Sequence, residues 1–415
     1  MKKMFLIFLL ASLVMLGFSQ EITVLHSGDT VLGDTTMFTI VVKNLTKDFP
    51  DVKVNFLKID LSDGSSLSMD AQLAAGTAPN IYLDTMVRAS KYIVPEFALP
   101  LNSYIRDLDK YNKGVLEPYT FNKKLLALPQ FGGAQAICIN LDIMNEIGYT
   151  VPDNWTVDDF LKMAELVKQK YQGKKWATGM FAANQSGDYL LHNWFSAFGA
   201  EYYKGGDYNR SVIAKTGGAK AYEFYQKLVK NEYVPPNCST LTDDDYAMQW
   251  YKGQLAATAF FPNWTEPYFK TAEAEGLKRF NYKFVPFPRG PGVKSVPTYF
   301  SNAAIVVHKT NNREVNQVAA RFAEYLNSAE IQSLQIKVGN VIPNRMDTIE
   351  PTDIYSNQVM SIVKKNGIYD AGLTDPRFTE RRALQFPILQ KVLTFKITPE
   401  DAIKQYENAL SAVKK

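Results

Sequence analysis

The residues that could do chemistry in this chain are few and widely spaced. Its three histidines are His26, His192 and His308, and none has a second histidine at helical spacing with which to bind zinc. The sequence contains no Gly-x-Ser-x-Gly elbow, phosphate-binding loop or dinucleotide-binding fingerprint. A Ser-His-Asp triad or a carboxylate pair could still assemble from distant positions, since there are 42 acidic residues. The sequence thus predicts no metal site and disfavours an enzyme without excluding one.

Aromatic side chains are the most plentiful candidates for ligand contacts. The chain has 25 Phe, 23 Tyr and 5 Trp residues. Most of them must fill the core, but Tyr and Trp also offer flat faces on which a ligand can stack. Trp194 shares a helical face with Phe195 and Phe198, so we expect it in the core.

The N-terminal residues have the anatomy of a cleavable secretory signal. Lys2 and Lys3 precede an apolar run at residues 4–16, and small residues follow at Gly17 and Ser19. This run is too short to span a membrane. We expect cleavage after Ser19, or one residue later, and a mature protein in the periplasm. No cysteine follows the run, so we expect no lipid anchor there.

Length and charge indicate the broad class of the protein. The chain has 415 residues, which suits two globular lobes better than one core. Its 46 basic and 42 acidic residues nearly balance, so the composition gives no support for a nucleic-acid or anionic-membrane partner.

The two cysteines could pair in an oxidising compartment, but their surroundings favour unpaired thiols. Cys138 lies in an apolar segment that predicts a buried strand, whereas Cys238 follows Pro235 and Pro236 in a predicted surface loop. A buried free thiol is an ordinary core residue.

The first part of the mature chain alternates strand and helix patterns. The patterns predict strands at residues 22–26, 52–59 and 81–83, and helices at residues 37–48 and 69–75, the second closed by Gly76. Alternation of this kind predicts a parallel sheet with crossover helices, and hence an α/β fold.

Three further helices carry clear start signals or apolar faces. Thr156 and Asp159 form a capping-box pair, and Trp155 is placed to pack on Phe160. Residues 314–327 present a single apolar stripe. The acidic run after Thr242 resembles a charged site, but the better explanation is a helix N-terminus capped by Thr242.

Motifs spread over the mature chain occur in an order known from one protein family. They are residues 25–29, 73–82, 126–129 with 139–142, 152–156, 253–257 with 262–264, 286–292, and 339–345. In this order they resemble the extracellular solute-binding proteins of bacterial ABC importers, in the branch that includes the maltose-binding protein. Asn80 departs from the usual Asp of the family's Gly-x-x-Pro-Asp turn, which we expect to alter only that turn.

The resemblance implies a type II periplasmic-binding-protein fold. Two α/β lobes, each with a mostly parallel sheet flanked by helices, would be joined by hinge strands near residues 129–134 and 296–302. We expect residues 20–133 and 302–341 in the N-terminal lobe, and residues 134–301 and 342–415 in the C-terminal lobe. The resemblance also implies a monomer without a cofactor that captures a solute, most often a carbohydrate, and delivers it to a membrane permease.

Ligands in such folds lie at the strand ends that face the cleft between the lobes. By resemblance, the expected ligand-binding residues are Asp29, Asp84, Gln130, Trp264, Tyr299 and Asn302. Asp29 and Asp84 would accept hydrogen bonds from sugar hydroxyl groups; the alternative role for each is to form a turn. Trp264 would stack on a sugar ring, although an indole also suits a core.

Several residues are weaker candidates, and two other functions stay open. His26 is an outside candidate, and Arg345 and Arg377 could reach a ligand, although surface ion pairing is the commoner fate of an arginine. A secreted carbohydrate-active hydrolase is the alternative from a different class. Within the binding class, the solute could be something other than a sugar.

Overall fold

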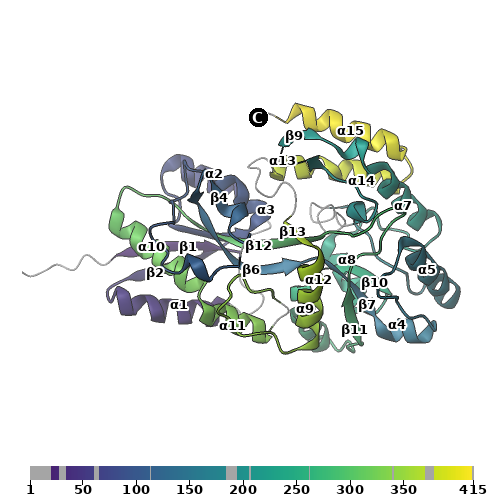
Figure 1. Ribbon diagram of the computed structural model, residues 1–415, viewed down its shortest axis with the longest axis horizontal. Coiled ribbons are helices and arrows are strands. Elements are labelled where there is room, and N and C mark those ends of the chain that lie inside the picture. Colours follow the sequence, from purple (N-terminus) through teal and green to yellow (C-terminus); the bar gives the residue numbers. More distant parts are fainter. Residues whose placement is uncertain are drawn as a thin grey trace, which may run out of the picture.

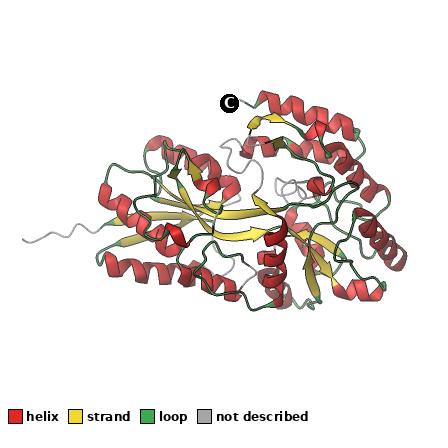
Figure 2. Cartoon of the chain, viewed as in Figure 1, coloured by secondary structure: helices red, strands yellow, loops and turns green. Residues whose placement is uncertain are grey.

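The computed structural model describes residues 20–27, 34–59, 65–112, 114–183, 194–204, 207–260, 262–338, 341–369 and 378–413. Helices and strands alternate along much of this chain, and most of the strands form two separate sheets (Figure 1). Helices surround both sheets, whose strands lie in the interior (Figure 2). The expected α/β class is confirmed.

The first sheet has six strands and mixed strand directions. Its order is β13 (Gly367–Tyr369), β12 (Thr298–Val307), β3 (Ile81–Thr85), β1 (Glu21–His26) and β2 (Lys53–Lys58), and β6 (Ala127–Ala134) also pairs with β12. β1 is parallel to both β2 and β3, as the alternating sequence pattern predicts. The crossovers contain α1 (Asp34–Asp48) and α2 (Ser65–Ala75). By contrast, β12 runs antiparallel to β3 and β6.

The second sheet corrects the expectation of a mostly parallel sheet in each lobe. Its three strands are β10 (Ala257–Phe260), β7 (Ala136–Asn140) and β11 (Tyr282–Val285), and both outer strands are antiparallel to β7. α9 (Pro262–Ala274) joins β10 to β11 as a crossover, so these two strands share one direction. β7 lies between β10 and β11 and runs in the direction opposite to both. It follows β6 after a single residue, Gln135.

The remaining elements follow the chain in order. They are α3 (Met86–Ala89), η1 (Ser90–Tyr92), η2 (Leu108–Lys110), η3 (Glu117–Tyr119), β4 (Thr120–Phe121), β5 (Lys124–Leu125), α4 (Leu141–Glu146), α5 (Val157–Tyr171), β8 (Tyr203–Lys204), β9 (Asp207–Ser211), η4 (Ile213–Lys215), α7 (Gly218–Lys230), α8 (Asp243–Tyr251), α10 (Arg313–Leu326), α11 (Ala329–Val338), α12 (Ile354–Asn366), α13 (Phe378–Ala383), α14 (Gln385–Leu393) and α15 (Pro399–Ala412).

Local signals fixed the helix ends that the sequence predicts. Thr156 and Asp159 form a reciprocal capping box at the start of α5, and Thr242 forms the same arrangement at the start of α8. The rings of Trp155 and Phe160 lie 6.0 Å apart. Gly76 ends α2 with a positive φ of 69°, which glycine adopts without steric cost.

The buried apolar side chains form two clusters that meet at β7. Ala136 and Cys138 belong to the cluster that contains the first sheet, whereas Ile137 and Ile139 belong to the second cluster. This division follows from the alternation of side chains across a strand. Trp194 is in the second cluster, with its ring 5.2 Å from that of Phe160, so its predicted core position is confirmed.

Both cysteines are free, as expected, but the predicted surface position of Cys238 is wrong. Its thiol belongs to the second core cluster because the turn after Pro235 folds back, with the Cys238 amide donating to the Pro235 carbonyl over 3.2 Å. Burial raises the pKa of Cys238 to about 11 and also raises the pKa of Cys138. Neither thiol is therefore poised as a nucleophile.

Of the helices in the described ranges, none combines the length and the apolar character that a membrane crossing requires.

Candidate functional site

Three neighbouring strands of the first sheet bring predicted site residues together. Ala304 of β12 lies opposite Asp84 on one side and opposite Pro129 of β6 on the other. β3 and β6 are both antiparallel to β12, so they run in the same direction and their carboxyl ends share one edge of the sheet. Asp84, Gln130 and Asn302 therefore lie on adjacent strands near this edge, which is where α/β sheets bind ligands.

Asp84 is completely buried, and its carboxylate is fully engaged by neighbouring donors. Oδ2 accepts hydrogen bonds from the Tyr82 hydroxyl and from Arg88 Nε, both over 2.7 Å. Oδ1 accepts from the Thr85 amide over 2.6 Å and from Arg88 Nη2 over 2.5 Å. Four donors fill the acceptor sites of a carboxylate. This geometry leaves Asp84 no free acceptor for a ligand hydroxyl, in contrast to its expected role.

Arg88 is the charged group that this arrangement presents outward. Its guanidinium meets Asp84 in a two-point ion pair, and 32% of its side chain is exposed whereas that of Asp84 is not exposed at all. Burial alone would lower the pKa of Arg88, but the hydrogen bonds to Asp84 raise it above its ordinary value. Among the described residues, Arg88 Nη1 has no hydrogen-bond partner. The guanidinium is thus held rigidly, with donors left over.

The sequence analysis missed Arg88, although its spacing from Asp84 carries a signal. Asp84 is the penultimate residue of β3, and Arg88 lies four residues later on the short helix α3, so the pair joins the strand end to the helix. α3 packs against α13, which comes from a much later part of the chain (Figure 1). Arg88 therefore lies where distant segments meet.

Tyr82 holds Asp84 in place, and Tyr92 in turn packs against Tyr82. The ring of Tyr82 packs edge-on against Tyr92 with centroids 5.3 Å apart, and Tyr92 donates to Asp70 over 3.0 Å. Burial, followed by the charge of Asp84 and the hydrogen bond to it, raises the pKa of Tyr82. Its hydroxyl therefore stays protonated and remains a donor to Asp84.

Gln130 lies in a β-bulge at the predicted hinge segment. Asn302 pairs with Gly132 and Ala304 with Pro129, so β6 contributes one extra residue between these two pairs. Bulges of this kind re-aim side chains next to functional sites. Gln130 itself is buried, and its Nε2 donates to the sulfur of Met37 over 3.2 Å.

A series of buried hydrogen bonds supports the segment of β6 that contains Pro129. Asn327 donates to the Pro129 carbonyl and accepts from Gln332. Gln332 in turn accepts from the Asn344 amide over 2.8 Å. Each of these polar groups is buried with a partner, which fixes the position of β6 at Pro129.

The other predicted contacts are placed by their backbones alone or lie outside the described residues. Tyr299 pairs with Ile368 across β12 and β13, and Trp264 is in the first turn of α9, but their side chains are outside the described part, as is that of Asn302. Asp29 and Arg377 also lie outside the described residues.

The weaker candidates have structural surroundings. His26 is buried at the end of β1, with its ring 4.7 Å from that of Phe38. Arg345 forms ion pairs as expected, but they are not at the surface: its side chain is only 3% exposed and pairs with Asp107 and Asp347. Hydrogen bonding to Arg345 lowers the pKa of Asp347. Burial with this double partnership fixes the loop that carries Arg345.

No metal site occurs in the part of the chain that the structure describes, where no group of three or more His, Cys, Asp or Glu side chains is arranged to hold an ion.

Comparisons with solved structures place this geometry in a known fold. A chitin oligosaccharide binding protein matches with a TM-score of 0.80 and 19% identity, covering 95% of this chain and 98% of the other. A maltose-bound protein of T. maritima matches with a TM-score of 0.76 and 19% identity, covering 95% and 100%. A substrate-binding protein of Listeria monocytogenes in complex with cycloalternan gives 0.76 and 18%, covering 94% and 98%. The fold is that of the type II periplasmic binding proteins.

Sequence comparisons give the family. The arabinooligosaccharide-binding protein of Bacillus subtilis is 26% identical over 261 residues, which are 54% of this chain and 59% of that protein. The match therefore spans less than two thirds of this relative. A family model described as bacterial extracellular solute-binding protein matches residues 41–360. The chain belongs to the family of bacterial extracellular solute-binding proteins.

Proposed function

We propose that this protein captures a carbohydrate outside the cytoplasm and delivers it to the permease of an ABC importer. The observation that carries the proposal is membership of the solute-binding family. The choice of a carbohydrate is supported by relatives that bind arabinooligosaccharides, chitin oligosaccharides and maltose.

Capture would occur by closure of two lobes around the ligand. The proposed lobes are residues 20–133 with 302–341, and residues 134–301 with 342–415. The paired strands β6 and β12, which contain the expected hinge segments, support this division. A ligand that touches both lobes stabilises the closed state over the open one, and that difference in affinity drives closure.

Arg88 would be the direct polar contact of the first lobe, with Asp84 acting through it. A guanidinium held at two points offers its remaining N–H groups in a fixed plane, which suits two neighbouring sugar hydroxyl oxygens. Asp29, Gln130, Tyr299 and Asn302 remain proposed contacts from the same region.

Trp264 would supply the stacking face of the second lobe. Its place in the first turn of α9, directly after β10, supports this assignment, because that turn lies at a strand end of the second sheet. A sugar ring presents C–H groups that pack well on an indole.

Transport rather than turnover is part of the proposal. The protein would be a monomer, exported by the N-terminal signal into the periplasm, and would return its ligand unchanged. The competing hypothesis is a secreted carbohydrate-active hydrolase. Mass spectrometry of an oligosaccharide incubated with the protein separates the two, because cleavage products would contradict capture without turnover.

A thermal-shift screen against oligosaccharides, amino acids and polyamines tests the ligand class. A sugar at one hundred times its dissociation constant should add about 2.7 kcal/mol to the stability of the folded protein. If amino acids or polyamines raise the melting temperature and no sugar does, the carbohydrate assignment fails while the family assignment stands.

A further inference from the structure

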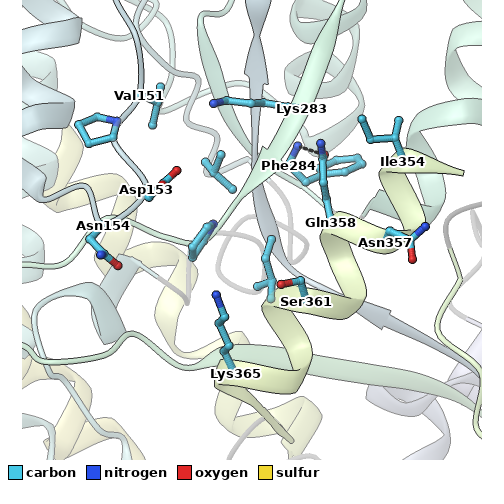
Figure 3. Close-up of a pocket in the computed structure, with 14 residues that line it drawn as sticks. Val151, Asp153, Asn154, Lys283, Phe284, Ile354, Asn357, Gln358, Ser361 and Lys365 are labelled. Carbon is cyan, nitrogen blue, oxygen red and sulfur yellow. Dashed lines mark hydrogen bonds between the residues drawn. The ribbon is translucent and has the colours of Figure 1, made fainter.

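A polar groove lies on the second sheet. Its main part is a cavity of about 760 Å³, bounded by β11, by α12 and by the loop at residues 151–154 (Figure 3). A smaller cavity of about 190 Å³ adjoins it and shares Asp153, Asn154, Pro286 and Lys365. Asp84, Arg88 and Gln130, the proposed sugar-site residues whose side chains the structure describes, line neither cavity. We call the two cavities together the β11 groove.

The charges in the β11 groove are strongly one-sided. Lys283 and Lys365 line the large cavity, and Arg289, Lys294 and again Lys365 line the small one. Among the described residues that line the two cavities, Asp153 is the one acidic residue. The whole chain carries a formal charge of only +4. The groove is therefore a local concentration of positive charge, which attracts anions.

These four cations have no acidic partners in the described part of the protein. None of them belongs to an ion pair there, in contrast to Arg88, Arg279, Arg321 and Arg345. Arg289 is nevertheless held in place, because its Nη2 donates to the Asn154 carbonyl over 3.0 Å. The cations are thus available to a partner from outside the molecule.

Side chains engage backbone groups along the edge of β11 that is not paired with β7. Gln358 of α12 accepts from the Phe284 amide over 2.9 Å, and Trp155 donates to the Pro286 carbonyl over 2.8 Å. Tyr355 stacks on Tyr282 with centroids 4.3 Å apart, which holds α12 against the strand. An added strand could not pair with these blocked backbone groups. A ligand of the groove would therefore bind through side chains.

We propose that the β11 groove binds an acidic peptide segment of a protein partner. The cations come from β11, from the segment at residues 289–294 and from the end of α12, so they are distributed along the groove and do not converge on one point. Such a distribution suits an extended chain with spaced carboxylates better than a single small anion. Asn357 and Ser361 of α12 also line the large cavity and add uncharged polar groups.

A fluorescent octaglutamate peptide, titrated into the full-length protein at low ionic strength, tests the proposal. We expect saturable binding that the double variant Lys283→Gln, Lys365→Gln weakens about tenfold, since two charge contacts are lost. Lys364→Gln is the matched control, because Lys364 is the neighbour of Lys365 on α12 but does not line the groove. It should change the affinity less than about twofold.

Three results would overturn the proposal. The first is no saturable binding of the peptide to the parent protein. The second is an equal loss in Lys364→Gln, which would mean that general surface charge attracts the peptide. The third is displacement by millimolar inorganic phosphate, or binding only to vesicles containing phosphatidylglycerol, either of which would assign the groove to a different anion. Thermal unfolding of each variant shows whether the fold is retained. Lys283 is half-exposed and Lys364 and Lys365 are exposed, so we expect none of the substitutions to change the melting temperature much.

Discussion

Arg88 and the cations of the β11 groove are the same kind of residue in two opposite situations. Arg88 is held against a buried carboxylate, and its partner Asp84 has no exposure to solvent. Lys365 and its neighbours line an open cavity without acidic partners among the described residues. A buried pair fixes geometry and is weakly screened by salt, whereas open cations attract partners at long range and are easily screened. Under the two proposals above, the comparison separates a site suited to precise recognition from a surface suited to attraction.

The largest effect on stability should come from breaking the buried ion pair between Asp84 and Arg88. Asp84→Ala removes the acceptor for four hydrogen bonds and leaves the Arg88 guanidinium without its partner. We expect a loss of about 3–5 kcal/mol in the free energy of unfolding, measured by urea denaturation. A loss below about 1 kcal/mol would mean that the pair is loose or solvated and that Asp84 does not fix Arg88.

Trp264→Ala is expected to affect binding and not stability. If Trp264 stacks on a sugar ring, the variant should bind every accepted sugar more weakly, by about 2 kcal/mol or more in calorimetric titration. Its melting temperature in the absence of sugar should stay close to that of the parent. An unchanged sugar affinity together with a much lower melting temperature would place Trp264 in the core instead.

Tyr82→Phe removes one donor from Asp84 and keeps the ring. The carboxylate keeps its bonds to Arg88 and Thr85, so the expected cost is about 1 kcal/mol of stability. Sugar affinity should fall slightly and equally for all accepted sugars, because the hydroxyl acts through Asp84 and Arg88. A change in the order of preference among sugars would show that Tyr82 itself contacts the ligand.

The smallest effect on stability should come from substitutions in the β11 groove. Lys365→Gln is expected to change the free energy of unfolding by less than about 0.5 kcal/mol, since the exposed lysine forms no ion pair with any described residue. In contrast, raising the ionic strength should weaken octaglutamate binding to the parent protein while sugar binding changes little. Equal salt sensitivity of the two ligands would remove the distinction between the two regions.

Local signals in the sequence predicted much of the fold. The capping box at Thr156, the helix cap at Thr242, the glycine end of α2 and the apolar face of α10 depend on residues within one or two turns, and all occur in the structure. The direction of β10 and β11 relative to β7 could not be predicted in this way. The burial pattern is the same for a strand in either direction, and the direction here depends on how the chain passes from β6 in the first sheet to β7 in the second.

The candidate site was predicted less completely, for a related reason. The sequence placed Asp84 at a strand end, but its hydrogen bonds to Tyr82 and Arg88 follow from the turn of the backbone into α3. Cys238 was misplaced because a proline-rich turn can fold inward as readily as outward. The lining of the β11 groove combines segments more than 200 positions apart, from Asp153 to Lys365, and no local pattern joins them.

Calorimetric titration of an oligosaccharide panel into the parent protein and Arg88→Lys tests the central claim most directly. Lysine keeps the positive charge but cannot hold Asp84 at two points and present a second planar edge. We predict that the parent binds at least one oligosaccharide and that Arg88→Lys weakens this binding by about tenfold or more, with a similar melting temperature. Equal affinity in the two proteins, or no oligosaccharide binding by the parent, would contradict the account.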